Sequence, residues 1–159
     1  TKDNVFHHYL YPHKYNPLTD YEFNPDINGQ FVIRSLEARD INTEADYAMM
    51  HFSLTKEQPF KNKDVYVYGA YNNFEINNSN KMHYNTNTKT YEAAILLKQG
   101  FYNYTYTTLN NNGLVNTTDV LGSFFETENE YTVIVYHKPF GSFFDRVIGV
   151  GNTVINLNR

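Results

Sequence analysis

Carboxylates are the first side chains in this sequence that could carry out chemistry. Asp119, Glu126, Glu128 and Glu130 lie within one acidic stretch around "SFFETENEY". Two carboxylates flanking a cleft can hydrolyse a glycosidic bond, but acids at alternate positions are typical of a solvated strand edge. No nucleophile elbow, phosphate loop or base-orienting pair accompanies them. We therefore predict that the chain is not an enzyme.

Histidines are the second candidates. His7 and His8 are adjacent, and His13 lies nearby. Metal ligands on one face of a strand are two residues apart, whereas neighbours point to opposite faces. The sequence also contains no Cys, which excludes disulfides and thiolate zinc sites. We predict no metal and no cofactor, and interpret the histidine pair as surface residues.

The overall composition favours β structure and argues against nucleic acid. Among 159 residues there are 15 Tyr and 12 Phe, and such side chains suit a half-buried pleated surface. The net charge is −4, without the basic stripe that phosphate binding requires. No apolar run approaches the roughly 20 residues that span a bilayer.

Strand signals separated by turns follow one another after residue 30. The expected strands are residues 30–36, 45–54, 64–71, 81–84, 90–97, 101–109, 130–137 and 145–157. We expect residues 45–54 to bury alternate side chains, residues 101–109 to keep a polar face in water, and residues 130–137 to be central. The pattern predicts an all-β, antiparallel immunoglobulin-like sandwich over residues 31–159. Residues 1–30 are expected to form an extended arm or the connection from an upstream domain.

Phenylalanines gather in two turns. Phe140, Phe143 and Phe144 lie in one turn, and Phe124 and Phe125 lie in another. Loop phenylalanines either fold under as a satellite core or contact a partner, because they are costly to leave in water. Both interpretations stay open here, and the second makes these five residues a candidate protein-binding site.

Residues 64–113 resemble the glycogen-binding modules of the early-set (E-set) sandwich class. The resemblance rests on "VYVYGAYNNF", Met82 and "TYEAAILLKQGFYNYTY". It implies a sandwich fold and a glycan site at Tyr71, Asn73 and Phe74. In the family pattern a Trp stands at position 74 and a Lys at position 105, where this chain has Phe74 and Thr105.

Nearly the whole chain resembles the C-terminal region of the type IX secretion system plug proteins. The segments "FNPDINGQFVIR" and "TEADYAMMHFSL" are similar, and "GSFFETENEYTVIVYHKPFGSFFDRVIGV" is the most specific part. The resemblance implies an exported protein in the periplasm or at the outer membrane. Its implied partner is the outer-membrane β-barrel translocon, whose pore it closes.

Three functional hypotheses follow from these observations. The first is a non-catalytic module that docks on the translocon and gates it, and it is the one we favour. The second is a carbohydrate-binding module that uses Phe74. The third is an accessory domain of a glycan-active enzyme.

Overall fold

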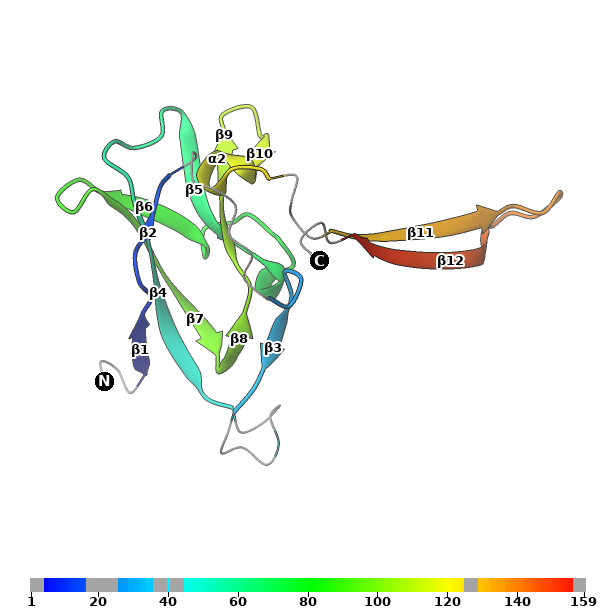
Figure 1. The fold of residues 1–159 in the computed structure, drawn as a ribbon, viewed down its shortest axis with the longest axis horizontal. Coiled ribbons are helices and arrows are strands. Elements are labelled where there is room, and N and C mark those ends of the chain that lie inside the picture. Colours follow the sequence, from blue (N-terminus) through cyan, green and yellow to red (C-terminus); the bar gives the residue numbers. More distant parts are fainter. Residues whose placement is uncertain (1–4, 17–25, 36–39, 41–44, 125–128, 156–159) are drawn as a thin grey trace. The chain divides into compact units, whose positions relative to one another are not determined.

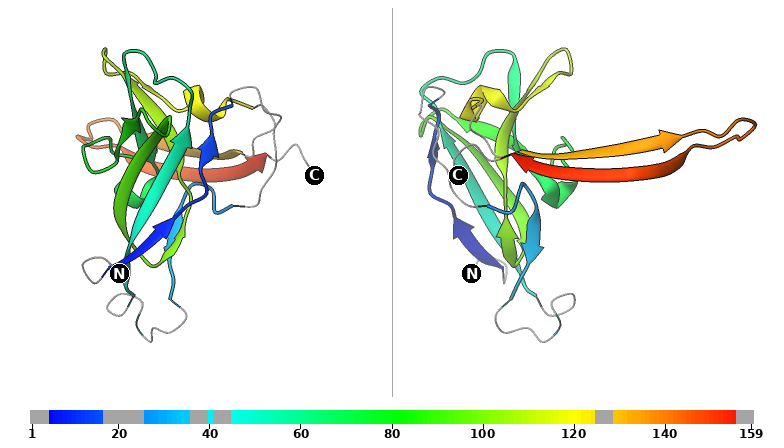
Figure 2. Two further views of the ribbon diagram at one scale, coloured as in Figure 1. Left: turned by 90° about the vertical axis from the view of Figure 1, so that its left-hand side faces the viewer. Right: turned by 45° about the vertical axis from the view of Figure 1, so that its right-hand side comes forward.

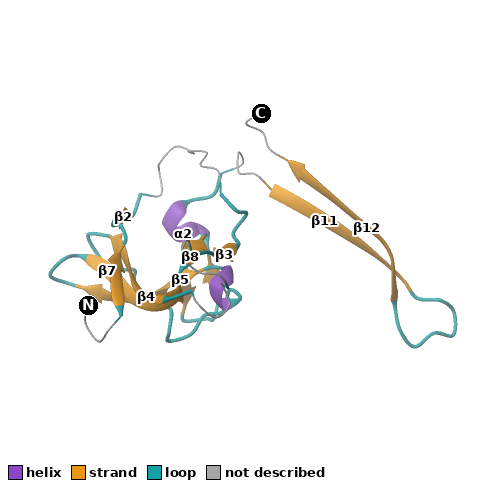
Figure 3. Ribbon diagram, turned by 90° about the horizontal axis from the view of Figure 1, so that it is seen from below, coloured by secondary structure: helices purple, strands orange, loops and turns teal. Residues whose placement is uncertain are grey.

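The computed structural model describes residues 5–16, 26–35, 40, 45–124 and 129–155, and strands make up most of them (Figures 1 and 3). The strands are β1 (Phe6–Tyr9), β2 (His13–Lys14), β3 (Phe31–Ile33), β4 (Tyr47–Thr55), β5 (Lys63–Tyr68), β6 (Lys81–Asn85), β7 (Thr90–Lys98), β8 (Gly100–Tyr102), β9 (Thr105–Asn110), β10 (Val115–Asn116), β11 (Asn129–His137) and β12 (Arg146–Ile155). Two short helical turns accompany them, the 3-10 turn Ala70–Asn72 and α2 (Thr118–Leu121). The fold is mostly β, as predicted. No helix in the described residues is long and apolar enough to cross a membrane.

The chain divides into two compact units. The first comprises residues 1–19 and 24–123, and its described part contains every element from β1 to α2. The second comprises residues 20–23 and 124–159, and its described part is Phe124 and the β11–β12 hairpin with its turn. Each unit is described separately below.

One mixed sheet forms most of the first unit. Its strand order is β1-β4-β7-β6-β5-β9-β10, with β2 also paired to β4, while β3 and β8 form a separate pair. β1 and β2 run parallel to β4, and the other pairs are antiparallel. The prediction of a purely antiparallel sheet is therefore wrong at this edge (Figure 2). Within the segment expected as an arm, residues 6–9 and 13–14 are extended and hydrogen-bonded to the sheet.

The alternation predicted for residues 45–54 is confirmed in β4, whereas β5 buries Val65, Tyr66 and Val67 in succession. Phe52 and Leu54 are buried on one face of β4, and Val65 and Val67 are fully buried on β5. These strands are separated in the sheet by β7 and β6, yet their buried side chains belong to one core cluster. The sheet must therefore curve around the core.

β6 provides the bend in the sheet. Its first two residues, Lys81 and Met82, pair with β5, whereas residues 83–85 pair with β7. A strand that changes partners along its length makes a corner between two sheet layers. Met82 at this corner is buried in the core.

The polar face expected in water on residues 101–109 is partly covered: Asn103 and Thr105 are half-buried, and Thr107 is buried. Thr107 and Thr108 are at most 1% exposed. The Thr107 hydroxyl donates to the Asn116 carbonyl oxygen, and the Thr108 hydroxyl donates to the Asp119 carboxylate. β10 and α2 supply these acceptors, so the threonines are buried without unpaired hydroxyls. The stretch also divides into β8 and β9 at residues 103–104.

The Asp119 carboxylate forms an ion pair in addition to its hydrogen bond with the Thr108 hydroxyl. Lys63 Nζ lies 2.5 Å from Asp119 Oδ2. Burial alone would raise the pKa of Asp119, but the hydrogen bonds from Lys63 and Thr108 lower the pKa below its ordinary value. This acid of the predicted acidic stretch therefore anchors α2 to the sheet.

Candidate binding surfaces

The second unit presents an apolar hairpin without a core of its own. β11 pairs with β12 from Asn129↔Ile155 to His137↔Arg146, and every described side chain of β11 is exposed. Apolar residues lie on both faces, with exposed fractions from 46% at Val135 to 64% at Val133 and Val150. The central position expected for residues 130–137 is therefore wrong within the described structure. A two-stranded hairpin alone is at best marginally stable in water, so this hairpin needs a covering surface.

The two faces of the hairpin differ in shape. Directly paired residues share a face, so Val133 lies beside Gly151 and Val135 beside Gly149. On this face β12 has no side chain at the two glycines, and a Cβ added to Gly151 would meet nothing within 4 Å. The other face carries Ile134 beside Val150. A partner can thus approach the β12 backbone closely on the glycine face.

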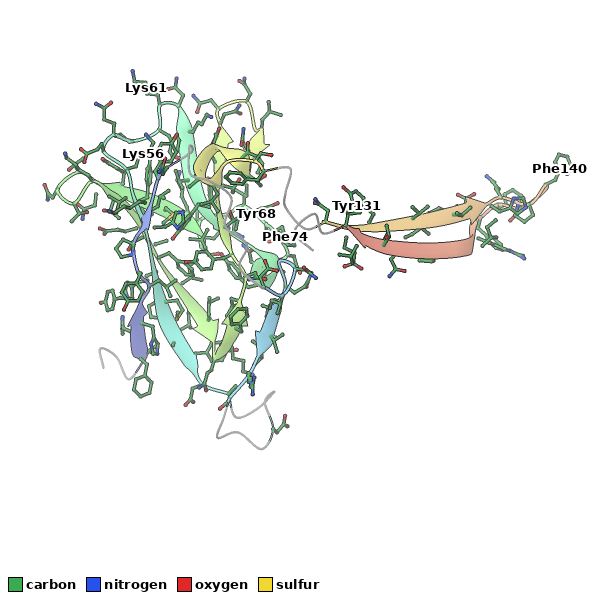
Figure 4. The ribbon with its side chains drawn as sticks, in the orientation of Figure 1. Lys56, Lys61, Tyr68, Phe74, Tyr131 and Phe140 are labelled. Carbon is green, nitrogen blue, oxygen red and sulfur yellow. The ribbon has the colours of Figure 1, made fainter. Side chains whose placement is uncertain are left out.

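The turn between β11 and β12 exposes aromatic rings. Phe140 and Phe143 are fully exposed, and Phe140 lies at the end of the turn (Figure 4). Phe144 is 60% exposed, and the Arg146 guanidinium lies 5.3 Å from its ring centroid. The turn is closed by a hydrogen bond from Ser142 N to the Pro139 carbonyl oxygen at 2.9 Å. Within the second unit, these three phenylalanines therefore do not form a satellite core.

The remaining predicted residues of this region are only partly described. Phe124 belongs to the second unit and is half-buried. Phe125, Glu126 and Glu128 lie outside the described residues. Glu130 is on β11 in the second unit, whereas Asp119 belongs to the first.

The predicted glycan residues Tyr71, Asn73 and Phe74 do not form one platform. Tyr71 packs against the core, its hydroxyl donates to the Val67 carbonyl oxygen at 3.0 Å, and burial raises the pKa of Tyr71 to about 12. Phe74 is 45% exposed and contacts Tyr68, with ring centroids 5.3 Å apart (Figure 4). Asn73 is exposed with a φ of 56° and ends the 3-10 turn. Tyr71 thus has a structural role, and only Phe74 offers an open ring.

Gly69 permits a close approach of two backbone segments at the start of this loop. Its φ of 177° is ordinary extended backbone, so the turn itself does not require glycine. A Cβ at this position would lie 2.8 Å from the Asn103 carbonyl oxygen. The Asn103 side chain in turn accepts hydrogen bonds from the backbone N–H groups of Ile27 and Gly29.

Asn80 holds the loop after Gly69, and sequence reasoning missed it. Its side chain is 1% exposed and donates to the carbonyl oxygens of Val67 and Glu75 at 2.8 and 2.9 Å. Its Oδ1 accepts from the Asn77 N–H at 3.0 Å. Nothing in the sequence distinguishes Asn80 from its many neighbouring asparagines, because only the fold buries it.

His7 and His8 point to opposite faces, as the adjacent positions predicted. His7 Nδ1 lies 2.9 Å from Nε2 of His51 on β4. His8 pairs with Met50, the residue before His51, and so faces the other way. In the described part of the chain no three His, Cys, Asp or Glu side chains gather as a metal site would need.

Acidification is expected to loosen the β1–β4 edge at this histidine pair. Burial, followed by the nearby His7, lowers the pKa of His51 in the folded protein. The unfolded chain, with a His pKa of about 6.5, then binds more protons than the folded one at low pH. The stability contributed by neutral His51 is therefore complete above about pH 6.5 and is lost as the pH falls through the folded pKa.

Hydrogen exchange of the β1 amides at about pH 7.5 and about pH 5.5, corrected for intrinsic rates, measures this effect. The His51→Gln variant keeps a hydrogen-bonding side chain that does not titrate. The protection of its β1 amides should therefore change less with pH than in the unchanged protein. An equal pH response in both proteins would contradict the assignment to His51.

The comparisons with known proteins include a match to a solved structure. No protein-family model and no curated protein matches this chain. Among solved structures, the chain is similar to a hypothetical protein from Parabacteroides merdae, with a TM-score of 0.85 and 35% sequence identity. The match covers 96% of this chain and 38% of that protein, so this chain spans well under half of its length. The match supports the β-rich fold, and the description "hypothetical" assigns no function.

Proposed function

We propose that this chain is a non-catalytic protein-binding module that docks through the β11–β12 hairpin. The observation that carries the proposal is the exposure of apolar side chains on both hairpin faces together with the fully exposed Phe140 and Phe143. Aromatic side chains are enriched at the centres of protein interfaces. A hairpin of this composition is stabilised when a partner surface covers it.

The resemblance to type IX secretion plug proteins names the partner in this proposal. The segment that carries the resemblance most specifically, residues 122–150, contains β11 and the phenylalanine turn. The proposed partner is the outer-membrane translocon, and the proposed location is the periplasmic side of the outer membrane. Gating would then be steric, because a docked rigid module occupies the pore entrance.

The first unit is proposed to be an immunoglobulin-like sandwich of the E-set type. The bend at β6 and the single core shared by β4 and β5 support this assignment. In this role the sandwich is the rigid body that carries the hairpin.

A pull-down with detergent-solubilised translocon tests the docking proposal. Replacing Phe140, Phe143 and Phe144 together by Ser should weaken binding by about 30-fold or more, as expected when interface hot spots are lost. The double variant Phe74→Ser/Phe101→Ser removes exposed rings from the first unit and should bind like the unchanged chain. Unchanged binding by the triple variant, with its circular dichroism spectrum intact, would show that the hairpin turn is not the interface.

A further inference from the structure

A groove crosses the face of the β4–β7–β6 region that points away from the core. Its volume is about 620 Å³. The side chains that carry its chemistry are Tyr9, His51, Ser53, Lys81, His83 and Glu92. All of them belong to the first unit, and none of the candidate residues discussed for the hairpin or for the Phe74 loop lines it.

The register of the strands explains why this face is hollow. Ser53 on β4 lies directly opposite Glu92 on β7, and His51 lies opposite Ala94. The side chains of Ser53 and Ala94 are short, and we call these two residues the floor of the groove. The longer side chains around them rise above this floor. Glu92 in turn lies opposite His83 on β6, which places the imidazole on the far side of the floor.

A wall of stacked rings closes one side of the groove. Tyr9 of β1 stacks on His51 with centroids 4.2 Å apart and planes 10° apart. His51 and its register partner Ala94 both line the groove, and the Ala94 side chain is only a methyl group. Because the pKa of His51 is lowered by burial and by His7, the ring is neutral at neutral pH. Neutral flat rings are the surface on which the C–H face of a sugar ring packs.

The polar groups around the floor are hydrogen-bonded or ion-paired, and the one charge without an ionic partner among those named is that of the Glu92 carboxylate. Glu92 Oε1 accepts hydrogen bonds from Asn85 Nδ2 at 3.3 Å and from Thr88 Oγ1 at 3.0 Å. These bonds orient the carboxylate and leave the directions of its second oxygen for a ligand. Lys81 Nζ is paired with Asp64 at 2.7 Å, so its charge is already compensated. The groove therefore combines donors and acceptors without an excess of positive charge that would select an anion.

We propose that this groove binds a neutral hexopyranose, either free or as the terminal residue of a glycan. One ring face of the sugar packs on the His51–Tyr9 wall, and its hydroxyl groups bond to Glu92, His83 and Ser53. The proposal concerns a different surface from the predicted Phe74 site and does not depend on the docking function of the hairpin.

Amide chemical shifts of the isotope-labelled full chain test the proposal. Methyl glucoside, methyl galactoside and methyl mannoside are added separately to about 20 mM, a range that detects dissociation constants near about 1 mM. At least one sugar should shift the amides of residues 51–53, 83 and 92–94 in a saturable manner. Glu92→Gln should weaken that binding by about tenfold, because a charged acceptor is lost.

Two further variants distinguish a blocked groove from a misfolded protein. Ala94→Leu fills the floor and should abolish the shifts, whereas Leu96→Ala lies on the same strand face outside the groove and should leave them unchanged. Shifts confined to Phe74 and Tyr68 would overturn the proposal in favour of the predicted loop site. Absence of shifts with all three sugars would overturn it as well.

Discussion

Replacing Leu54 by alanine should lower the free energy of unfolding by about 3 to 5 kcal/mol. Leu54 is fully buried in the core cluster that β4 shares with β5, β7 and β9. Its truncation removes buried apolar volume from a curved sheet whose backbone hydrogen bonds limit relaxation, so a cavity remains. The melting temperature of the first unit should fall by about 10 to 20 °C.

Urea unfolding monitored by circular dichroism measures this change, with Leu96→Ala as the matched control. Leu96 is on β7 and is 49% exposed, so its truncation should cost less than about 1 kcal/mol. Similar losses in the two variants would contradict the buried position of Leu54.

Replacing Asn80 by alanine should lower the free energy of unfolding by about 2 to 4 kcal/mol. This is the second of the two largest effects that we predict. The substitution removes both donors to the carbonyl oxygens of Val67 and Glu75 and the acceptor of the Asn77 N–H. Loss of a buried partner costs about 1 to 3 kcal/mol for each group left unsatisfied. The Val67 carbonyl oxygen still accepts a hydrogen bond from the Tyr71 hydroxyl, and the Glu75 carbonyl oxygen still accepts one from the Asn72 amide. The expected loss of stability is therefore smaller than the sum for three unsatisfied groups.

The control for this experiment is Asn78→Ala in the same loop. Asn78 is exposed, and its substitution should change stability by about 0.5 kcal/mol or less. Asn80→Asp should destabilise at least as much as Asn80→Ala, since a carboxylate accepts but cannot donate to the two carbonyls. A neutral effect of Asn80→Ala would show that the loop does not depend on the buried amide.

The strands that alternation predicted well are those with one face on the core. In β4 the sequence Phe52, Ser53, Leu54 places every second side chain in the cluster, and the structure follows it. The same pattern failed in β9, where Thr107 and Thr108 are both buried. Their acceptors belong to residues 116 and 119, and no local pattern reveals that a later segment will cover a strand.

Two other features could not be read from local sequence for different reasons. Residues 6–9 of β1 show little periodicity of their own, and their parallel pairing with β4 could not be predicted because the choice of a strand partner is non-local. The apolar character of both faces of β11 predicts a central strand. The same pattern is required of a hairpin that a partner covers, and composition does not distinguish the two cases.

The sequence separations between paired residues also predict an order of folding. In the first unit Tyr47 pairs with Lys98 and Lys63 with Asn110, whereas in the second unit His137 pairs with Arg146. A local hairpin can form within about 10 μs, but long-range pairs must wait for slow loop closure. During refolding the apolar hairpin therefore forms transiently before the sheet is complete. Its free edges can then recruit other chains, so refolding yield should fall as protein concentration rises.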